Sequence, residues 1–83
     1  MKYFLFVNFN NGLMHNAVHK TLGDVLESVK QLICDEGLSV KRERLPNVYG
    51  IEKYLNKNDD YFGQLANGTW YHIQPQNIFE VIK

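Results

Sequence analysis

The chain is short and electrically balanced: it has 83 residues, in which nine basic side chains offset nine acidic ones. A strongly basic chain favours nucleic acid or an anionic membrane, and a strongly acidic one favours mimicry of nucleic acid; neither bias is present. Hydrophobic residues make up 45% of the sequence and aromatic residues 13%, which is enough for one packed core and argues against disorder. We therefore expect residues 1–83 to form a single domain.

The sequence favours a cytoplasmic protein without a membrane segment. The apolar run at residues 3–7 is too short for a signal peptide, and no stretch approaches the roughly 20 apolar residues of a membrane span. Cys34 is the single cysteine, so no intramolecular disulfide can form. These features predict a reducing compartment.

The first predicted element is a β-hairpin. Residues 2–9 (KYFLFVNF) run into Asn11-Gly12, a dipeptide typical of a two-residue type I′ turn, and then into residues 13–19. Such a loop pairs Phe9 with Met14, Val7 with Asn16 and Leu5 with Val18.

With this register, both faces of the hairpin are apolar. Alternation along the strands predicts Tyr3, Leu5, Val7, Phe9, Met14 and Val18 on one face, and Phe4, Phe6, Leu13, His15, Ala17 and His19 on the other. One face is sufficient for a core. The second therefore requires a cover or a partner.

An amphipathic helix follows the hairpin. Thr21 can act as its N-cap, and Gly37 supplies a C-terminal stop. Between these two residues, apolar side chains recur at helical spacing: Leu22, Val25, Leu26, Val29, Leu32 and Ile33. The pattern predicts a helix over residues 22–36 whose apolar stripe covers the Tyr3-Leu5-Val7-Phe9 face.

The middle of the chain has a weaker pattern. Residues 39–45 (SVKRERL) are typical of a charged edge strand, and residues 48–56 of a short helix that presents Ile51, Tyr54 and Leu55.

A second hairpin is predicted at Asn67-Gly68, between strands at residues 61–66 and 69–73. A two-residue loop there pairs Leu65 with Trp70 and Phe62 with Ile73, and leaves open which pair is in the core. Residues 77–83 (NIFEVIK) have the pattern of a closing strand, with Pro75 in the connection because proline cannot donate to a central ladder.

These elements predict an α+β fold. We expect a mostly antiparallel sheet of four or five strands packed on one long helix, in the order ββα, a short helix or strand, and then βββ.

Up to Gly50 the chain resembles a ubiquitin-like β-grasp domain. A hairpin starts at the first residue, TLGDVLESVKQLICDEG stands in place of the family's helix, and RERLPNVYG stands in place of the following strand and turn. The sequence departs from the family at Pro46 and at its C-terminus, which has no diglycine. The resemblance implies a sheet face offered to partner proteins and does not imply conjugation.

Catalytic and metal-binding patterns are weak. His15 and His19 are four residues apart, but in a strand that spacing is about 13 Å, too far for a shared metal ion. Cys34 lies on the flank of the apolar stripe without a neighbour that would activate a thiol, so we expect it to be partly buried and inert. The sequence therefore predicts no enzyme, no metal and no cofactor.

Aromatic and basic side chains instead predict an interaction surface, because these types are enriched at binding hot spots. We expect a protein partner to contact Phe4, Phe6, His15, His19, Arg42, Arg44, Tyr54, Trp70 and Tyr71. The predicted function is that of a small inhibitor, adaptor or phage-type accessory protein, and homodimerisation is another use of the same face. The alternative is a nucleic-acid-binding module that uses residues 41–44 with Lys53 and Lys57.

Overall fold

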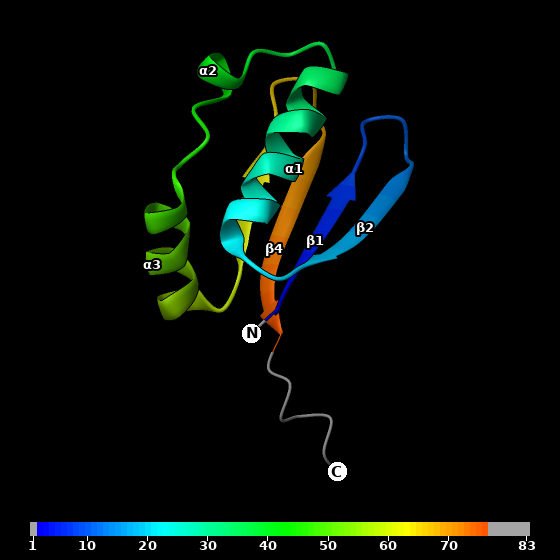
Figure 1. The fold of residues 1–83 in the computed structure, drawn as a ribbon. Helices are drawn as coiled ribbons and strands as arrows, with labels where there is room; N and C mark the ends of the chain where they lie inside the picture. The colour runs from blue at the N-terminus through cyan, green and yellow to red at the C-terminus, as the bar shows by residue number, and fades with distance from the viewer. Residues whose placement is uncertain (1, 77–83) are drawn as a thin grey trace.

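The computed structural model describes residues 2–76 as a four-stranded antiparallel sheet with helices packed on one face (Figure 1). In chain order, the elements are β1 (Lys2–Asn8), β2 (Met14–His19), α1 (Leu22–Asp35), α2 (Val40–Glu43), α3 (Val48–Asn58), β3 (Tyr61–Gln64) and β4 (Trp70–Gln76). The strand order is β2-β1-β4-β3, so the first and last described strands are central. The α+β class is confirmed. No helix among residues 2–76 has the length and apolar character needed to cross a membrane.

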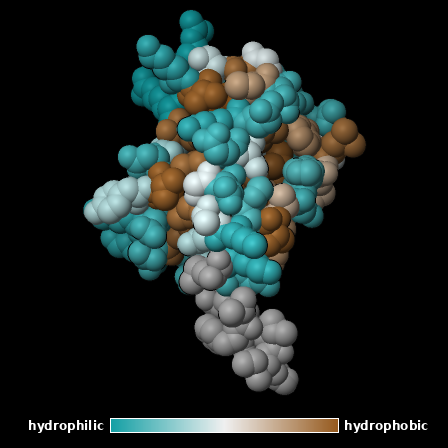
Figure 2. Space-filling model, viewed as in Figure 1, coloured by the Kyte–Doolittle hydropathy of each residue, from teal (hydrophilic) through white to brown (hydrophobic). Residues whose placement is uncertain are grey.

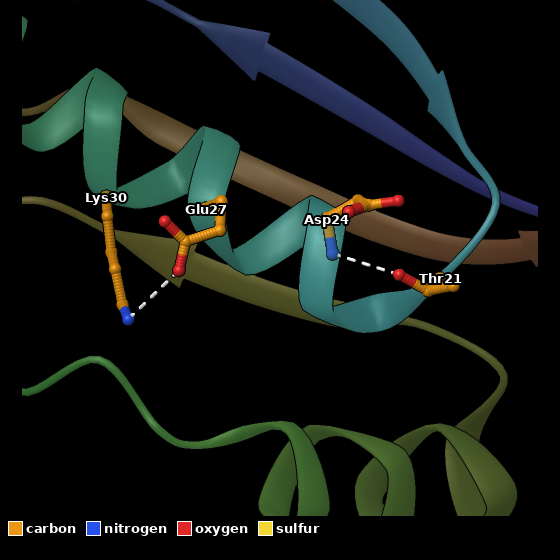
Figure 3. Close-up of polar contacts among 4 residues, drawn as sticks. All are labelled: Thr21, Asp24, Glu27 and Lys30. Carbon is orange, nitrogen blue, oxygen red and sulfur yellow. Dashed lines mark hydrogen bonds and ion pairs between the residues drawn. The ribbon is translucent and has the colours of Figure 1, made fainter.

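Helix α1 forms where the apolar spacing predicts it. The hydroxyl of Thr21 accepts a hydrogen bond from the Asp24 N–H at 3.1 Å, which satisfies one of the free donors at the helix start (Figure 3). Gly37, with φ +75°, follows the C-cap residue Glu36 and ends the helix.

The core lies between the sheet and two helices. Its sheet residues in β1 and β4 are all odd-numbered, which identifies the face that the helices cover. The buried hydrophobic residues are Leu5, Val7, Leu22, Val25, Leu26, Val29, Ile33, Ile51, Leu55, Leu65, Tyr71 and Ile73. Figure 2 shows the helix-bearing side of the molecule, where hydrophobic residues form small patches among hydrophilic ones.

The first hairpin has a three-residue loop, so the predicted two-residue loop is wrong. The Phe9 N–H donates to the Leu13 carbonyl at 2.8 Å, and the Gly12 N–H donates to the Phe9 carbonyl at 3.0 Å. Gly12 has φ +93°, but Asn11 is not at positive φ, and a type I′ turn requires positive φ at both positions. Instead, the Asn11 side chain accepts from the Leu13 N–H at 3.0 Å.

The second hairpin repeats this loop. The Leu65 N–H donates to the Thr69 carbonyl at 2.7 Å, Gly68 has φ +94°, and the Asn67 side chain accepts from the Thr69 N–H at 3.0 Å. Each loop therefore contains one residue more than predicted.

This extra residue shifts both registers by one. Leu5 lies opposite Ala17 and not Val18, and Phe62 lies opposite His72 and not Ile73. Because side chains alternate with a period of two, the shift moves every side chain of β2 to the other face relative to β1. Val18 and Met14 therefore share a face with Phe4 and Phe6, whereas His15, Ala17 and His19 lie on the helix side.

Three further predictions are corrected. Residues 39–45 do not form an edge strand: the Ser39 side chain caps α2, and Arg44 ends it at φ 53°. Pro75 is not in a connection but lies within β4, opposite Tyr3 of β1. This part of β4 extends beyond Ile73, the last residue that pairs with β3. Cys34 is exposed, not partly buried, because it lies on the outer side of α1. The strand predicted at 77–83 lies outside the described residues.

Candidate functional site

The face of the sheet opposite the helices carries a group of aromatic side chains. The even-numbered residues of β1 and β4 point to this side, because their odd-numbered neighbours are in the core. We call this surface the open face. Its hydrophobic and aromatic members are Phe4, Phe6, Met14, Val18, Phe62, Trp70 and His72.

The aromatic rings on the open face contact one another. On β3 and β4, the Phe62 ring centroid lies 5.4 Å from that of Trp70 and 5.6 Å from that of His72. On β1, the rings of Phe4 and Phe6 are 5.7 Å apart. These separations are those of stabilising aromatic pairs, so the rings hold one another in place.

The aromatic group is continuous across the sheet and reaches solvent. Phe6 lies opposite His72, which lies opposite Phe62, so one row of rings crosses three strands. Phe62 is 52% exposed, Val18 53% and Met14 66%. Phe62 on β3 lies at one edge of the sheet and Val18 and Met14 on β2 at the other. The half-buried rings of Phe6 and His72 lie between them and connect them. A connected hydrophobic surface is typical of interaction sites, whereas single exposed hydrophobic residues are ordinary.

The open face carries few charged residues, and most of its polar side chains are neutral amides. Lys2 is the single lysine or arginine in the four described strands, and none of these strands contains an aspartate or glutamate. Asp60 precedes β3, and its Oδ2 lies 4.0 Å from His72 Nε2. The amides are Asn8, Asn16, Gln64, Gln74 and Gln76.

Of the side chains predicted to contact a partner, Phe4, Phe6 and Trp70 lie on the open face. Tyr71 does not lie on a surface, because it is 3% exposed and belongs to the core. Burial raises the pKa of its phenol well above the usual range.

The two predicted histidines lie on the helix side of β2. His19 Nε2 is 3.1 Å from the hydroxyl of Ser28 in α1. His15 and His19 line a groove of about 430 Å³ between β2 and α1, which also includes Phe9 and Asp35. Across residues 2–76, no three His, Cys, Asp or Glu side chains gather as a metal site would require.

The predicted basic residues lie outside the open face. Arg42 is in α2, and Arg44 is its C-cap. Tyr54 of α3 packs edge-on against Tyr61 with ring centroids 5.4 Å apart, and it lines a shallow pocket with Lys53 and Lys57.

Met14, Val18, Phe62 and His72 are members of the open face that the predicted site omits. Their position follows from the three-residue loops, and the Asn-Gly pairs do not reveal the loop length. No signal in the sequence distinguishes the two loop lengths, because the three-residue loop differs in having glycine alone at positive φ.

No protein-family model matches this sequence, and comparisons with curated proteins and with solved structures returned no match. The resemblance to ubiquitin-like domains therefore rests on the sequence pattern alone.

Proposed function

We propose that this domain is a non-enzymatic protein-binding module that docks its open face on a protein. The observation that carries the proposal is the contiguous aromatic group on the side of the sheet away from the helices, which includes Phe62 and Trp70. Complete burial of one such side chain contributes about 1.5–3 kcal/mol, and tryptophan is among the residues most often found at hot spots.

The charge of the open face favours a protein over nucleic acid. Surfaces that bind single-stranded nucleic acid combine aromatic rings with a positively charged groove. Here the strands supply Lys2 alone, and Asp60 lies beside His72. The basic residues of the nucleic-acid alternative, in residues 41–44 and at Lys53 and Lys57, belong to α2, its C-cap and α3, in the helical layer.

The fold also supports docking without rearrangement. The face is part of a sheet whose strands are held by ladder hydrogen bonds, and its rings pack against one another. The packed rings have less side-chain freedom to lose on binding than isolated side chains would, which lowers the entropic cost of association. A rigid surface of this kind suits an inhibitor or adaptor that acts by covering part of its partner.

Site-specific photo-cross-linking tests the proposal. The photoreactive residue p-benzoylphenylalanine replaces Phe62 in the full chain, the protein is irradiated in the cells it comes from, and adducts are identified by mass spectrometry. The matched control carries the same residue at Tyr49, which is 71% exposed on α3.

We expect one defined protein adduct at position 62 and none at position 49. A Trp70→Ala change in the cross-linking chain should reduce this adduct by on the order of tenfold. Equal adducts at both positions, or adducts with nucleic acid alone, would contradict the proposal.

A further inference from the structure

We infer that the protein docked on the open face is a second copy of this chain, so that the domain dimerises by packing sheet on sheet. The second copy is a partner of the class proposed above, and its assignment rests on that proposed function. Three properties of the open face support it: its division into two matching halves, its charges and its size.

The open face consists of two halves that meet at the boundary between β1 and β4. The β2–β1 half holds Phe4, Phe6, Met14 and Val18, and the β4–β3 half holds Phe62, Trp70 and His72. A two-fold axis parallel to the strands and above this boundary lays β1 on β4 of the other copy, and β2 on β3. Each hydrophobic half then covers the other, as a closed two-fold interface requires.

The strand register makes the two halves complementary in shape. With this axis, residues that pair across the boundary within one copy face each other between copies. They are Phe4 with Gln74, Phe6 with His72, and Asn8 with Trp70. Two of these pairs set a large ring against a smaller amide, so the faces can interdigitate.

The charges of the face are also compatible with a second copy. The chain has a formal net charge of zero, so two copies do not repel each other. Lys2 and Asp60 have opposite charge and lie at the same end of the sheet, on opposite halves. The two-fold axis keeps the ends together and exchanges the halves, so it brings Lys2 of each copy over the half that holds Asp60 of the other.

The size of the face fits a dimer in equilibrium with its monomer. Four strands of up to seven residues have a plan area of roughly 400 Å². The accessible area is larger because side chains stand out from the sheet, and stable interfaces bury about 800 Å² on each partner. We therefore expect a weak dimer, whose population rises with concentration.

Sedimentation equilibrium of the full chain from about 1 μM to 1 mM tests the inference. We expect the mass to rise toward that of two chains. Phe62→Glu places a carboxylate in the packed face and should raise the dimer dissociation constant at least about tenfold. Tyr49→Glu, the same change on exposed α3, should leave the dissociation constant unaltered. Circular dichroism verifies that both variants are folded.

A second measurement does not depend on a variant. In an equal mixture of labelled and unlabelled protein, isotope-filtered NMR spectra should contain contacts between the Phe6 ring of one copy and the His72 ring of the other. A chain that is monomeric up to about 1 mM, or a dimer insensitive to Phe62→Glu, would overturn the inference.

The failures of the two proposals are distinguishable. If the chain is monomeric and position 62 cross-links to a different protein, the second copy is excluded and the docking function stands. If the chain is monomeric and position 62 gives no adduct beyond the control at position 49, both proposals fail.

Discussion

The ring of Tyr71 lies over the backbone of Gly63, in the space that a side chain at position 63 would need. The two residues are opposite each other on β4 and β3, on the helix side of the sheet. Tyr71 is 3% exposed, and its ring centroid lies 6.2 Å from that of Tyr61. A glycine in the edge strand thus lets a large aromatic side chain complete the core.

Replacing Gly63 with alanine should therefore destabilise the protein. The added methyl group would displace the Tyr71 ring from a packed core, and overpacking of this kind costs about 1–3 kcal/mol. The matched control is Gly23→Ala in the first turn of α1, where the nearest atom to a new Cβ, Thr21 Oγ1, is 3.7 Å away. Urea unfolding should show a loss for Gly63→Ala only; equal stability of the two variants would refute this account.

The buried phenol of Tyr71 should also make stability depend on alkaline pH. Burial raises its pKa above the ordinary value of 10.0. The unfolded chain consequently loses this proton at a lower pH than the folded chain. The free energy of unfolding therefore has its full value below about pH 10 and falls as the pH rises above it. The pKa of Tyr61 is raised in the same direction, again chiefly by burial.

Tyr71→Phe removes the ionisable group and keeps the ring. We expect the fall in the urea midpoint above about pH 10 to be shallower in this variant than in the parent, with a residual slope from Tyr61. Tyr49→Phe, at an exposed position on α3, is the control and should follow the parent. Parallel curves for Tyr71→Phe and the parent would show that the phenol has no such role.

A carboxylate at the end of α1 holds the second hairpin loop. Glu36 Oε1 accepts from the Asn67 side-chain amide at 3.0 Å and from the Thr69 hydroxyl at 3.3 Å, and Thr69 is 0% exposed. Glu36→Ala removes both contacts and leaves a buried hydroxyl without this acceptor, which should cost about 1–3 kcal/mol.

The control for Glu36→Ala is Glu27→Ala. Glu27 is exposed, and its carboxylate contacts Lys30 Nζ at 3.4 Å (Figure 3). Exposed pairs of this kind contribute little, so Glu27→Ala should change stability by less than about 0.5 kcal/mol. Thermal or urea unfolding compares the two variants, and an equal loss in both would mean that the loop contacts do not contribute.

Much of the fold could be predicted from local sequence signals. The apolar spacing and the Thr21 cap place α1, and alternation along β1 separates Leu5 and Val7 in the core from Phe4 and Phe6 on the open face. These signals are reliable because they depend on neighbouring residues alone.

The composition of the open face could not be predicted, because it depends on one backbone angle in each loop. Asn-Gly fits both a two-residue loop and the end of a three-residue loop, and the choice turns on whether asparagine also adopts positive φ. An error of one residue placed Val18 with the core and paired Phe62 with Ile73. For residues 39–45, the run of charged residues suggested an edge strand, but the Ser39 cap and the left-handed Arg44 close a helical turn.

The repeated loop has a chemical consequence for the ageing of the protein. In an Asn-Gly pair the glycine nitrogen can attack the carbonyl carbon of the asparagine side chain, which closes a five-membered cyclic imide and releases ammonia. Water then opens the ring at either carbonyl and leaves aspartate or isoaspartate. The described contacts hold the Asn67 side chain through Glu36 and Thr69, but hold that of Asn11 through Leu13 alone. On storage, peptide mapping should therefore find deamidation at Asn11 before Asn67. Once deamidation occurs at Asn67, the new carboxylate faces that of Glu36 in place of the amide donor, and their repulsion loosens the loop.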